Sequence, residues 1–141
     1  MKISENLPQF DNGESLLIAS GDFEADFYLA SKGEINKVDS FLVERRNAEI
    51  PVGFVAAESG NIKTLKKFRH SEFVEEFKKH LSALLAKQPV KEIFLFAPSE
   101  MKNELEKALP ANLRKNLRVY EGNFHKEHPF KLLEKLASLP E

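Results

Sequence analysis

The segment Glu92–Phe124, EIFLFAPSEMKNELEKALPANLRKNLRVYEGNF, constrains the fold of this chain more than any other stretch of the sequence. Its first part, Ile93–Ala97, is wholly apolar. A short strand without polar alternation is typical of a strand that is buried on both faces of a sheet and pairs in parallel with a neighbour. A proline-bounded helix and a second strand around Leu117 follow. The segment therefore predicts a strand–helix–strand unit inside an α/β domain.

The first third of the sequence predicts an antiparallel meander. Leu16–Ala19 is a short apolar run, consistent with an inner strand. In Ala25–Leu29 apolar and polar residues alternate, which indicates a half-buried strand. Ser31–Glu34 has the composition of a hairpin turn, and Ile35–Val43 supplies a third strand.

Three helices are expected after the meander. The longest begins at Ser71, whose side chain can cap it, with three glutamates near its positive end. Its apolar side chains fall at helical spacing: Phe73, Phe77, Leu81, Leu84 and Leu85. The second helix begins at Pro98 or Ser99 and ends at Pro110, and the third begins at Pro129.

The predicted order of elements is β-β-β-α-β-α-β-α. Three antiparallel strands followed by βαβ units is the layout of ribonuclease H-like domains, so the sequence predicts an α/β, three-layer domain with a mixed sheet. At 141 residues, a single domain spanning 1–141 is expected. Within it, residues 1–14 form an N-terminal arm and residues 45–69 a long connection. The basic end of that connection has an alternative interpretation as an earlier turn of the long helix.

Composition excludes several classes of protein. The chain has no cysteine, which removes disulfides, thiolate catalysis and cysteine-bound zinc and suits a reducing cytoplasm. No signal peptide and no apolar stretch long enough to span a membrane is visible, so a cytoplasmic location is expected. The charge is split: residues 1–60 hold 5 Lys/Arg against 11 Asp/Glu, and residues 61–141 hold 16 against 11. Such asymmetry is compatible with a nucleic-acid-facing surface or with lysine-rich outer faces of helices.

Three segments resemble one family. LLIASGDFEADFYLASKGEI resembles the opening of bacterial host attachment proteins, FRHSEFVEEFKKHLSALL resembles their long helix, and EIFLFAPSEMKNELEKAL resembles their strand that runs into Ala-Pro and a helix. The resemblance spans roughly residues 15–138. These proteins are similar to the central domain of archaeal and eukaryotic peptide-release factors, so the resemblance implies a ribonuclease H-like fold of the translation machinery.

Two departures from the family pattern bear on function. The release-factor domain carries a Gly-Gly-Gln loop between its early strands and its long helix, and residues 45–69 of this chain contain no such triplet. The resemblance therefore does not imply a peptide-release activity for this chain. The family also tends to have an Asp-Leu-Thr-like element after the last strand, where this chain has Asn123–Lys126.

The carboxylates that a ribonuclease H-type nuclease needs are missing from their expected strands. Such enzymes bind two divalent metals through several converging carboxylates. The first strand, Leu16–Ser20, has no acid, and the later strand ends with Phe96–Pro98. Asp22, Asp26 and Asp39 are interpreted as turn residues and residues of solvent-facing strand positions. No catalytic residue is assigned.

A candidate metal motif is the H-x-x-H pattern of His125–His128, to which Glu121 offers a further ligand. This spacing suits a helix, whereas Pro129 indicates that the histidines precede one. Loop histidines, with His128 near a helix cap, are the favoured interpretation. No metal and no cofactor are expected.

The best functional segment is the basic connection with the start of the long helix. Its residues are suited to meet phosphates and to stack on a base. They are Arg45, Arg46, Lys63, Lys66, Lys67, Phe68 and Arg69. The sequence thus predicts a non-catalytic binding module that contacts RNA, the ribosome or a protein partner. Two alternatives stay open: a hydrolase whose histidine or carboxylate site the sequence does not show assembled, and a pure protein-attachment factor.

Overall fold

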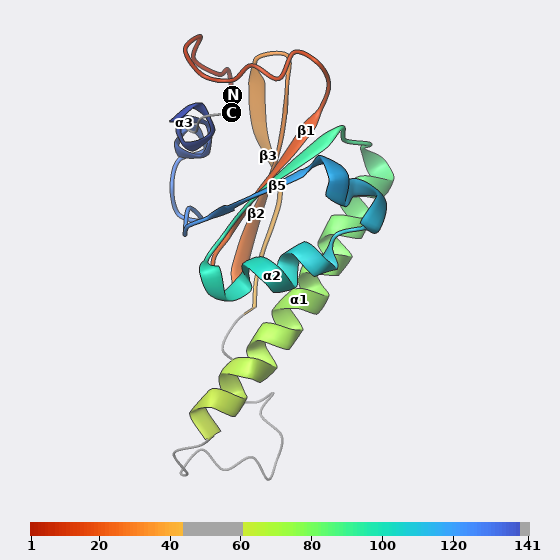
Figure 1. The fold of residues 1–141 in the computed structure, drawn as a ribbon, viewed down its shortest axis with the longest axis vertical. Helices are drawn as coiled ribbons and strands as arrows, with labels where there is room; N and C mark the ends of the chain where they lie inside the picture. Colours follow the sequence, from red (N-terminus) through yellow and green to blue (C-terminus); the bar gives the residue numbers. More distant parts are fainter. Residues whose placement is uncertain (44–60, 139–141) are drawn as a thin grey trace.

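A computed structural model describes the backbone of residues 1–43 and 61–138 and the side chains of residues 1–43 and 71–138 (Figure 1). The elements, in chain order, are β1 (Ser15–Ser20), β2 (Glu24–Ser31), β3 (Glu34–Leu42), α1 (Asn61–Lys87), β4 (Glu92–Ala97), α2 (Ser99–Ala108), the short 3₁₀ helix η2 (Ala111–Asn116), β5 (Leu117–Glu121) and α3 (Pro129–Ser138).

The five strands form one mixed sheet in the order β3-β2-β1-β4-β5. β1, β2 and β3 pair antiparallel, as a meander does. β4 lies between β1 and β5 and is parallel to both, with Ile93 opposite Leu16 and Leu117. The predicted order of elements and the inner position of Ile93–Ala97 are both confirmed, and all five residues of that run are buried.

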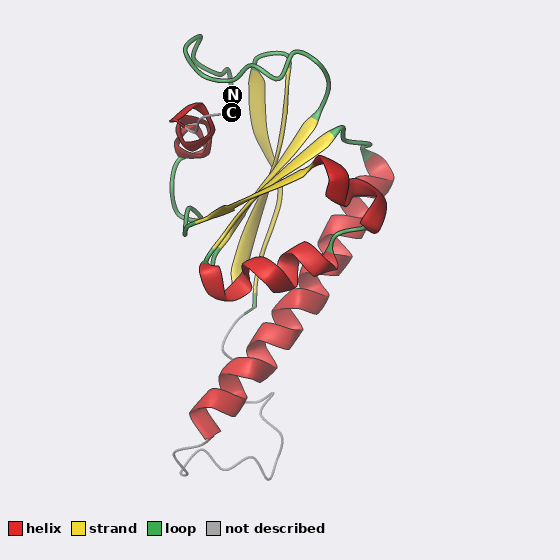
Figure 2. Cartoon of the chain, in the orientation of Figure 1, coloured by secondary structure: helices red, strands yellow, loops and turns green. Residues whose placement is uncertain are grey.

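Helices cover both faces of the sheet (Figure 2). α1 and α2 pack on one face, where Phe73, Phe77 and Met101 join Ile18 and Leu95 in one apolar cluster. On the other face α3 and the N-terminal arm pack over a second cluster. Its buried members are Ile3, Leu17, Ala19, Tyr28, Ala30, Ile35, Phe94, Phe96, Leu132 and Leu133. No helix in the described parts of the chain is long and apolar enough to cross a membrane.

The hairpin between β2 and β3 has the predicted place and a left-handed backbone. Lys32 and Gly33 have φ values of 47° and 77°. Two successive positive φ values are typical of a type I′ turn, whose twist matches that of the flanking strands. The turn also holds the N-terminal arm, because the Gly33 N–H donates to the Gln9 carbonyl oxygen at 2.7 Å.

α1 begins at Asn61, ten residues before the predicted start at Ser71. The described end of the predicted connection, residues 61–69, is therefore helical. The physical reason is that no proline or glycine interrupts Asn61–Lys87, so a helix nucleated by its packed aromatic stripe can extend toward the N-terminus. Glu72, which the sequence places near the positive end of the helix, lies well inside it.

Asp26 does not lie on a solvent-facing position, which corrects the prediction from β2. Its side chain is only 8% exposed, and its neighbour on the same face, Tyr28, is 4% exposed. The alternation in β2 separates two faces that are both covered, because α3 and the loop before it lie over the polar side. Asp39, by contrast, is partly exposed, and Asp22 lies in the bend between β1 and β2.

We expect Phe77→Ala to be among the most destabilising single substitutions. Phe77 is fully buried and its ring lies 5.8 Å from that of Phe27. Truncation of such a side chain leaves a cavity and costs about 3–5 kcal/mol of the free energy of unfolding. Urea denaturation measures this loss, with Lys79→Ala on the exposed side of the same helix as the control. A loss below about 1 kcal/mol would contradict the packing of α1 on the sheet.

Candidate functional site

α1 is longer than the sheet that it covers. Its 27 residues give a length of about 40 Å at 1.5 Å per residue. Among the described side chains of the helix, Phe73 is the first that belongs to the core. Figure 1 shows the yellow-green start of α1 extending past the end of the sheet where β4 leads into α2. Residues 61–70, which we call the basic helix start, form roughly the first 15 Å of this helix.

A histidine and an aromatic stack fix the packed part of α1 against β3. The ring of Phe41 lies 5.2 Å from that of Phe73 and 4.6 Å from that of His80. The Nδ1 atom of His80 lies 2.7 Å from Asp39 Oδ2, and its Nε2 atom lies 3.7 Å from Glu76 Oε2. These contacts orient the helix, and with it the direction in which the basic helix start projects.

Five of the seven predicted binding residues lie in the basic helix start, and two lie outside the described residues. Those in α1 are Lys63, Lys66, Lys67, Phe68 and Arg69, and those outside are Arg45 and Arg46. Positions 63, 66 and 67 are related by three and four residues and therefore share one face of the helix. No acidic residue stands between Glu58 and Glu72 in the sequence.

The position of these cations on the helix is electrostatically unfavourable for the helix itself. The N-terminus of an α-helix carries a partial positive charge, so a cation in the first turn, here Lys63, weakens the helix by a few tenths of a kcal/mol, and the effect falls off for cations further along. α1 has no acidic residue in its first turn to offset them. The charge that costs stability there is the same charge that attracts an anion.

A second candidate site, the histidine pocket, lies where β2 begins. The loop 122–128 crosses this place after β5, and Gly122 begins the loop by donating its N–H to the Ala97 carbonyl oxygen at 2.9 Å. Gly122 has a φ of 152°, and a Cβ there would lie 2.4 Å from the ring of Phe124, so the position requires glycine. The pocket has a volume of about 560 Å³ and is lined by Asp26, Tyr28, Lys37, His125, Glu127 and Pro129 among others. That volume is within the range of small-molecule sites.

His125 lies between two carboxylates. Its Nδ1 atom is 3.4 Å from Glu24 Oε1, and its Nε2 atom is 3.5 Å from Asp26 Oδ2. The Nδ1 atom is buried and has no hydrogen-bond partner in the described structure. Lys37 places its Nζ atom 3.6 Å from the same Asp26 oxygen. In the imidazolium form both ring nitrogens carry a hydrogen, and each then faces an acceptor.

The arrangement of the pocket limits its chemistry. Both ring nitrogens of His125 face protein carboxylates, so neither points a free lone pair at a bound molecule. His128 does not join it: its Nδ1 atom accepts a hydrogen bond from the Phe130 N–H at 3.1 Å, as a cap of α3. Among the described residues no group of three or more histidines and acids is arranged to hold a metal ion.

The sequence does not show that Glu24, Asp26 and His125 meet. In the sequence the two acids belong to a meander, and the histidine belongs to a candidate metal pair. A signal is present in the two glycines, Gly21 and Gly122, that flank the ends of β1 and β5. In open α/β sheets ligands bind outside the carboxyl ends of parallel strands, and these glycines mark two such ends.

No protein-family model and no curated protein matches the chain. Among solved structures it is similar to an archaeal translation termination factor, aRF1, with 18% identity over 81% of this chain and 32% of the other, and a TM-score of 0.47. It is also similar to a chain of ribosome-bound archaeal Pelota and ABCE1, with 13% identity over 86% and 34% and a TM-score of 0.47. A third is the Alp12 filament, with 16% identity over 92% and 47% and a TM-score of 0.45. The chain spans 32–47% of the length of these proteins.

Tyr28, which lines the histidine pocket, has a raised pKa. Burial raises the pKa of Tyr28 above its ordinary value of 10.0, and the negative charge of Asp26 raises it further. The folded chain therefore holds this proton more tightly than the unfolded chain. Its contribution to stability is complete below pH 10.0 and is lost as the pH rises through the raised pKa.

We predict that Tyr28 ionises above pH 10.0 in the folded protein. The chain has two tyrosines, so Tyr120→Phe leaves Tyr28 as the only one, and the ultraviolet absorbance of tyrosinate then reports its pKa directly. Adding Asp26→Asn to this variant should bring the pKa down, because it removes a negative neighbour. A midpoint at or below 10.0 before denaturation would contradict the buried position of the ring.

Proposed function

We propose that the protein is a non-catalytic binding module that contacts RNA through the basic helix start. The observation that carries the proposal is that α1 begins at Asn61, far before its first described core residue, Phe73. The four cations of residues 61–70 therefore sit on a projecting helix end. The resemblance of three sequence segments to the host attachment family, and through it to release-factor domains, directs the proposal toward ribosomal RNA.

The charge pattern along α1 separates the basic helix start from the rest of the helix. Beyond residue 70 lysines lie beside glutamates: Lys78 Nζ is 3.9 Å from Glu75 Oε1, and Lys79 Nζ is 3.5 Å from Glu76 Oε1. Residues 61–70 include no glutamate or aspartate that could pair in this way. A helix in water gains from such pairs, so their absence at one end is not explained by helix stability.

The helix dipole and the lysines act in the same direction on an RNA phosphate. Phosphates bind at helix N-termini because the free N–H groups and the dipole both favour a negative charge. Lysine and arginine add contacts that release condensed counterions. Phe68 supplies a ring on which a base can stack, and Arg45 and Arg46 precede the helix in the sequence.

The test is the salt dependence of RNA binding by a fourfold variant. Replacing Lys63, Lys66, Lys67 and Arg69 by Ala should weaken binding of a single-stranded RNA. It should also reduce the slope of log K against log salt by about 0.7 for each phosphate that the variant no longer neutralises. Fluorescence anisotropy from about 50 mM salt upward measures both quantities. The melting temperature should stay nearly unchanged or rise slightly, because cations near the N-terminus of a helix are unfavourable by only a few tenths of a kcal/mol.

A matched control removes four other lysines. Lys79, Lys107, Lys115 and Lys131 are exposed and lie outside the basic helix start, and their replacement by Ala changes the net charge equally. Equal loss of RNA affinity in both variants would indicate a general charge effect and overturn the assignment of the site. No detectable binding of RNA at about 50 mM salt would overturn the RNA proposal and favour a protein partner.

A hydrolase is the second candidate function, because the structure brings a histidine and a carboxylate together beside a pocket. Asp26 contacts His125 at 3.5 Å in the histidine pocket, an arrangement that orients an imidazole in many hydrolases. For His125 to take a proton from a substrate, Glu24 must first leave its Nδ1 atom. The basic helix start needs no such rearrangement, which is why RNA binding is the first proposal.

Hydrolysis of nitrophenyl esters and phosphates tests this second candidate. If His125 acts as a general base, His125→Gln should slow release of nitrophenol by at least about 100-fold. His80→Gln is the control, because that histidine also contacts two carboxylates but lies on the α1 face of the sheet. Wild-type and His125→Gln proteins that are equally slow would exclude a catalytic role of His125 toward these substrates.

A further inference from the structure

Within the described residues, no strand lies beside the outer edge of β5. β5 is the last strand of the sheet, and in the described structure it pairs with β4 alone. A free strand edge presents a row of N–H and C=O groups that can pair with another chain. Natural proteins protect such edges with short strands and charges, and β5 has only five residues, with Arg118 and Glu121 among them.

Arg118 is the cation on this edge, and its described surroundings offer it no partner. Arg118 is exposed and lies opposite Phe94 of β4. It has no ion-pair or hydrogen-bond partner among the described residues. Side chains alternate along a strand, so Arg118 shares one face with Tyr120, while Leu117 and Val119 lie on the α2 face. An added strand would therefore meet a cation on one face and apolar side chains on the other.

A cleft lies beside β5 on the face of the sheet that carries Arg118. It has a volume of about 1090 Å³, and its lining includes Phe10, Asp11, Lys91, Glu92, Phe94, Arg118 and Tyr120. Two of the charged groups are already engaged: Lys91 Nζ donates to the Asn12 carbonyl oxygen at 3.3 Å, and Glu92 accepts from Ser15 Oγ at 3.1 Å. Within the described structure, Arg118 has no such contact beside β5.

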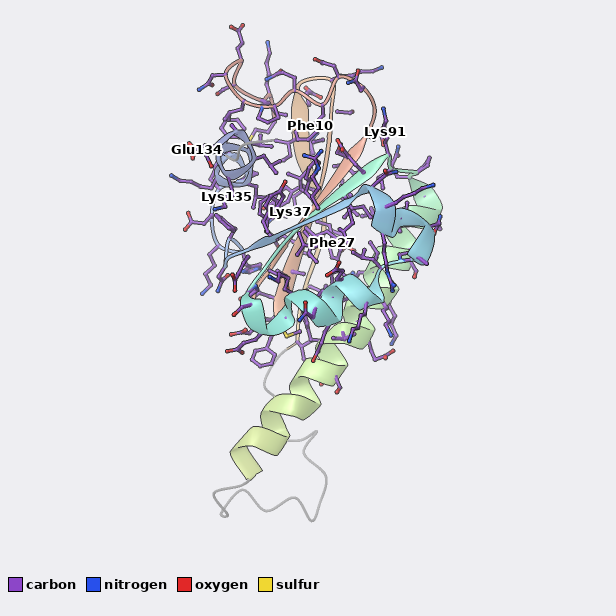
Figure 3. All side chains as sticks on the ribbon, viewed as in Figure 1. Phe10, Phe27, Lys37, Lys91, Glu134 and Lys135 are labelled. Carbon is purple, nitrogen blue, oxygen red and sulfur yellow. The ribbon has the colours of Figure 1, made fainter. Side chains whose placement is uncertain are left out.

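The N-terminal arm forms part of this cleft and holds one of its residues, Phe10, in a strained backbone conformation. Phe10 has a φ of 54°, which is rare for a bulky side chain, and the Lys32 N–H donates to its carbonyl oxygen at 3.1 Å. The ring of Phe10 thereby stands edge-on against Phe94, with the two centroids 6.0 Å apart. Figure 3 shows Phe10 and Lys91 toward the same end of the sheet. Backbone strain of this kind persists where the surrounding structure holds it, and it is often found at binding sites.

We propose that the β5 edge and this cleft bind an extended acidic peptide, which adds to the sheet as a sixth strand. Main-chain hydrogen bonds to β5 would give affinity, and a carboxylate opposite Arg118 would give specificity. Apolar side chains at the alternating positions of the peptide would lie beside Leu117 and Val119. The proposal does not depend on RNA binding, since β5 and the basic helix start are different elements.

A second copy of the chain fits this edge less well than an acidic peptide. Antiparallel pairing of β5 with itself about Val119 would place Arg118 opposite Tyr120 and Glu121 opposite Leu117. Neither charge would then meet its opposite directly across the pair. A strand with carboxylates on the Arg118 face matches the charge that self-pairing leaves unmatched.

The experiment uses synthetic eight-residue peptides that alternate valine with glutamate or valine with lysine. The full chain should bind the glutamate peptide at least about tenfold more tightly than the lysine peptide, as measured by fluorescence anisotropy. Arg118→Glu should reverse this preference. A glutamate peptide with N-methyl groups at alternate residues cannot form the main-chain pairs and should not bind.

Three results would overturn the proposal. One is equal binding of the N-methylated peptide, which would show that no strand is added. Another is an unchanged charge preference in Arg118→Glu, with Lys115→Glu as the control for net charge. The third is a dimer in sedimentation that the glutamate peptide dissociates, which would assign the edge to a second copy of the chain. The fourfold Ala variant of the basic helix start should bind the glutamate peptide as the wild type does. Loss of RNA binding is therefore distinguishable from loss of peptide binding.

Discussion

The parallel pairing of β1 with β4 joins the two parts of the chain, and the other elements are placed by it. Ser15–Ala19 pairs with Glu92–Phe96, and the Ser15 hydroxyl donates to Glu92 across 77 positions of sequence. Both strands are buried on their two faces, so each contributes side chains to both apolar clusters. Contacts this distant in sequence cost chain entropy to form, and here the apolar burial on two faces offsets that cost. The meander is carried on one side of this pair and β5 on the other.

Parts of the fold are predictable from the sequence where a segment has only one favourable environment, and are not where it has two. A wholly apolar run such as Ile93–Ala97 has one favourable environment, a strand covered on both faces, and its place is readable from composition alone. The alternation around Asp26 has two possible environments, and only the packing of α3 decides that the polar side is covered. The start of α1 at Asn61 depends on helix propagation beyond its packed stripe, which no local cap or stop signal marks.

The candidate sites also differ in how much of each can be predicted from the sequence. The cations of the basic helix start are visible as a cluster in the sequence, but their position at the positive end of a helix is not. His125 and Asp26 are 99 positions apart, and no local pattern brings them together. The free edge of β5 follows from strand order, which a single sequence does not determine for the last strand of a sheet. The sequence therefore shows which residue types are present more readily than which residues they contact in the fold.

The described ion pairs also bear on the charge split between the two parts of the chain. The described ion pairs across that division are made by histidines: His80 pairs with Asp39, and His125 pairs with Glu24 and Asp26. The described lysine pairs of the second part are local ones along α1 and α3, such as Lys131 with Glu134. The described ion pairs of lysine thus do not join residues 71–138 to the acids of residues 1–43. α1 concentrates four of the cations of the second part in its first turns, at the end of the helix where the dipole is positive, and a cluster of like charges raises the potential around it.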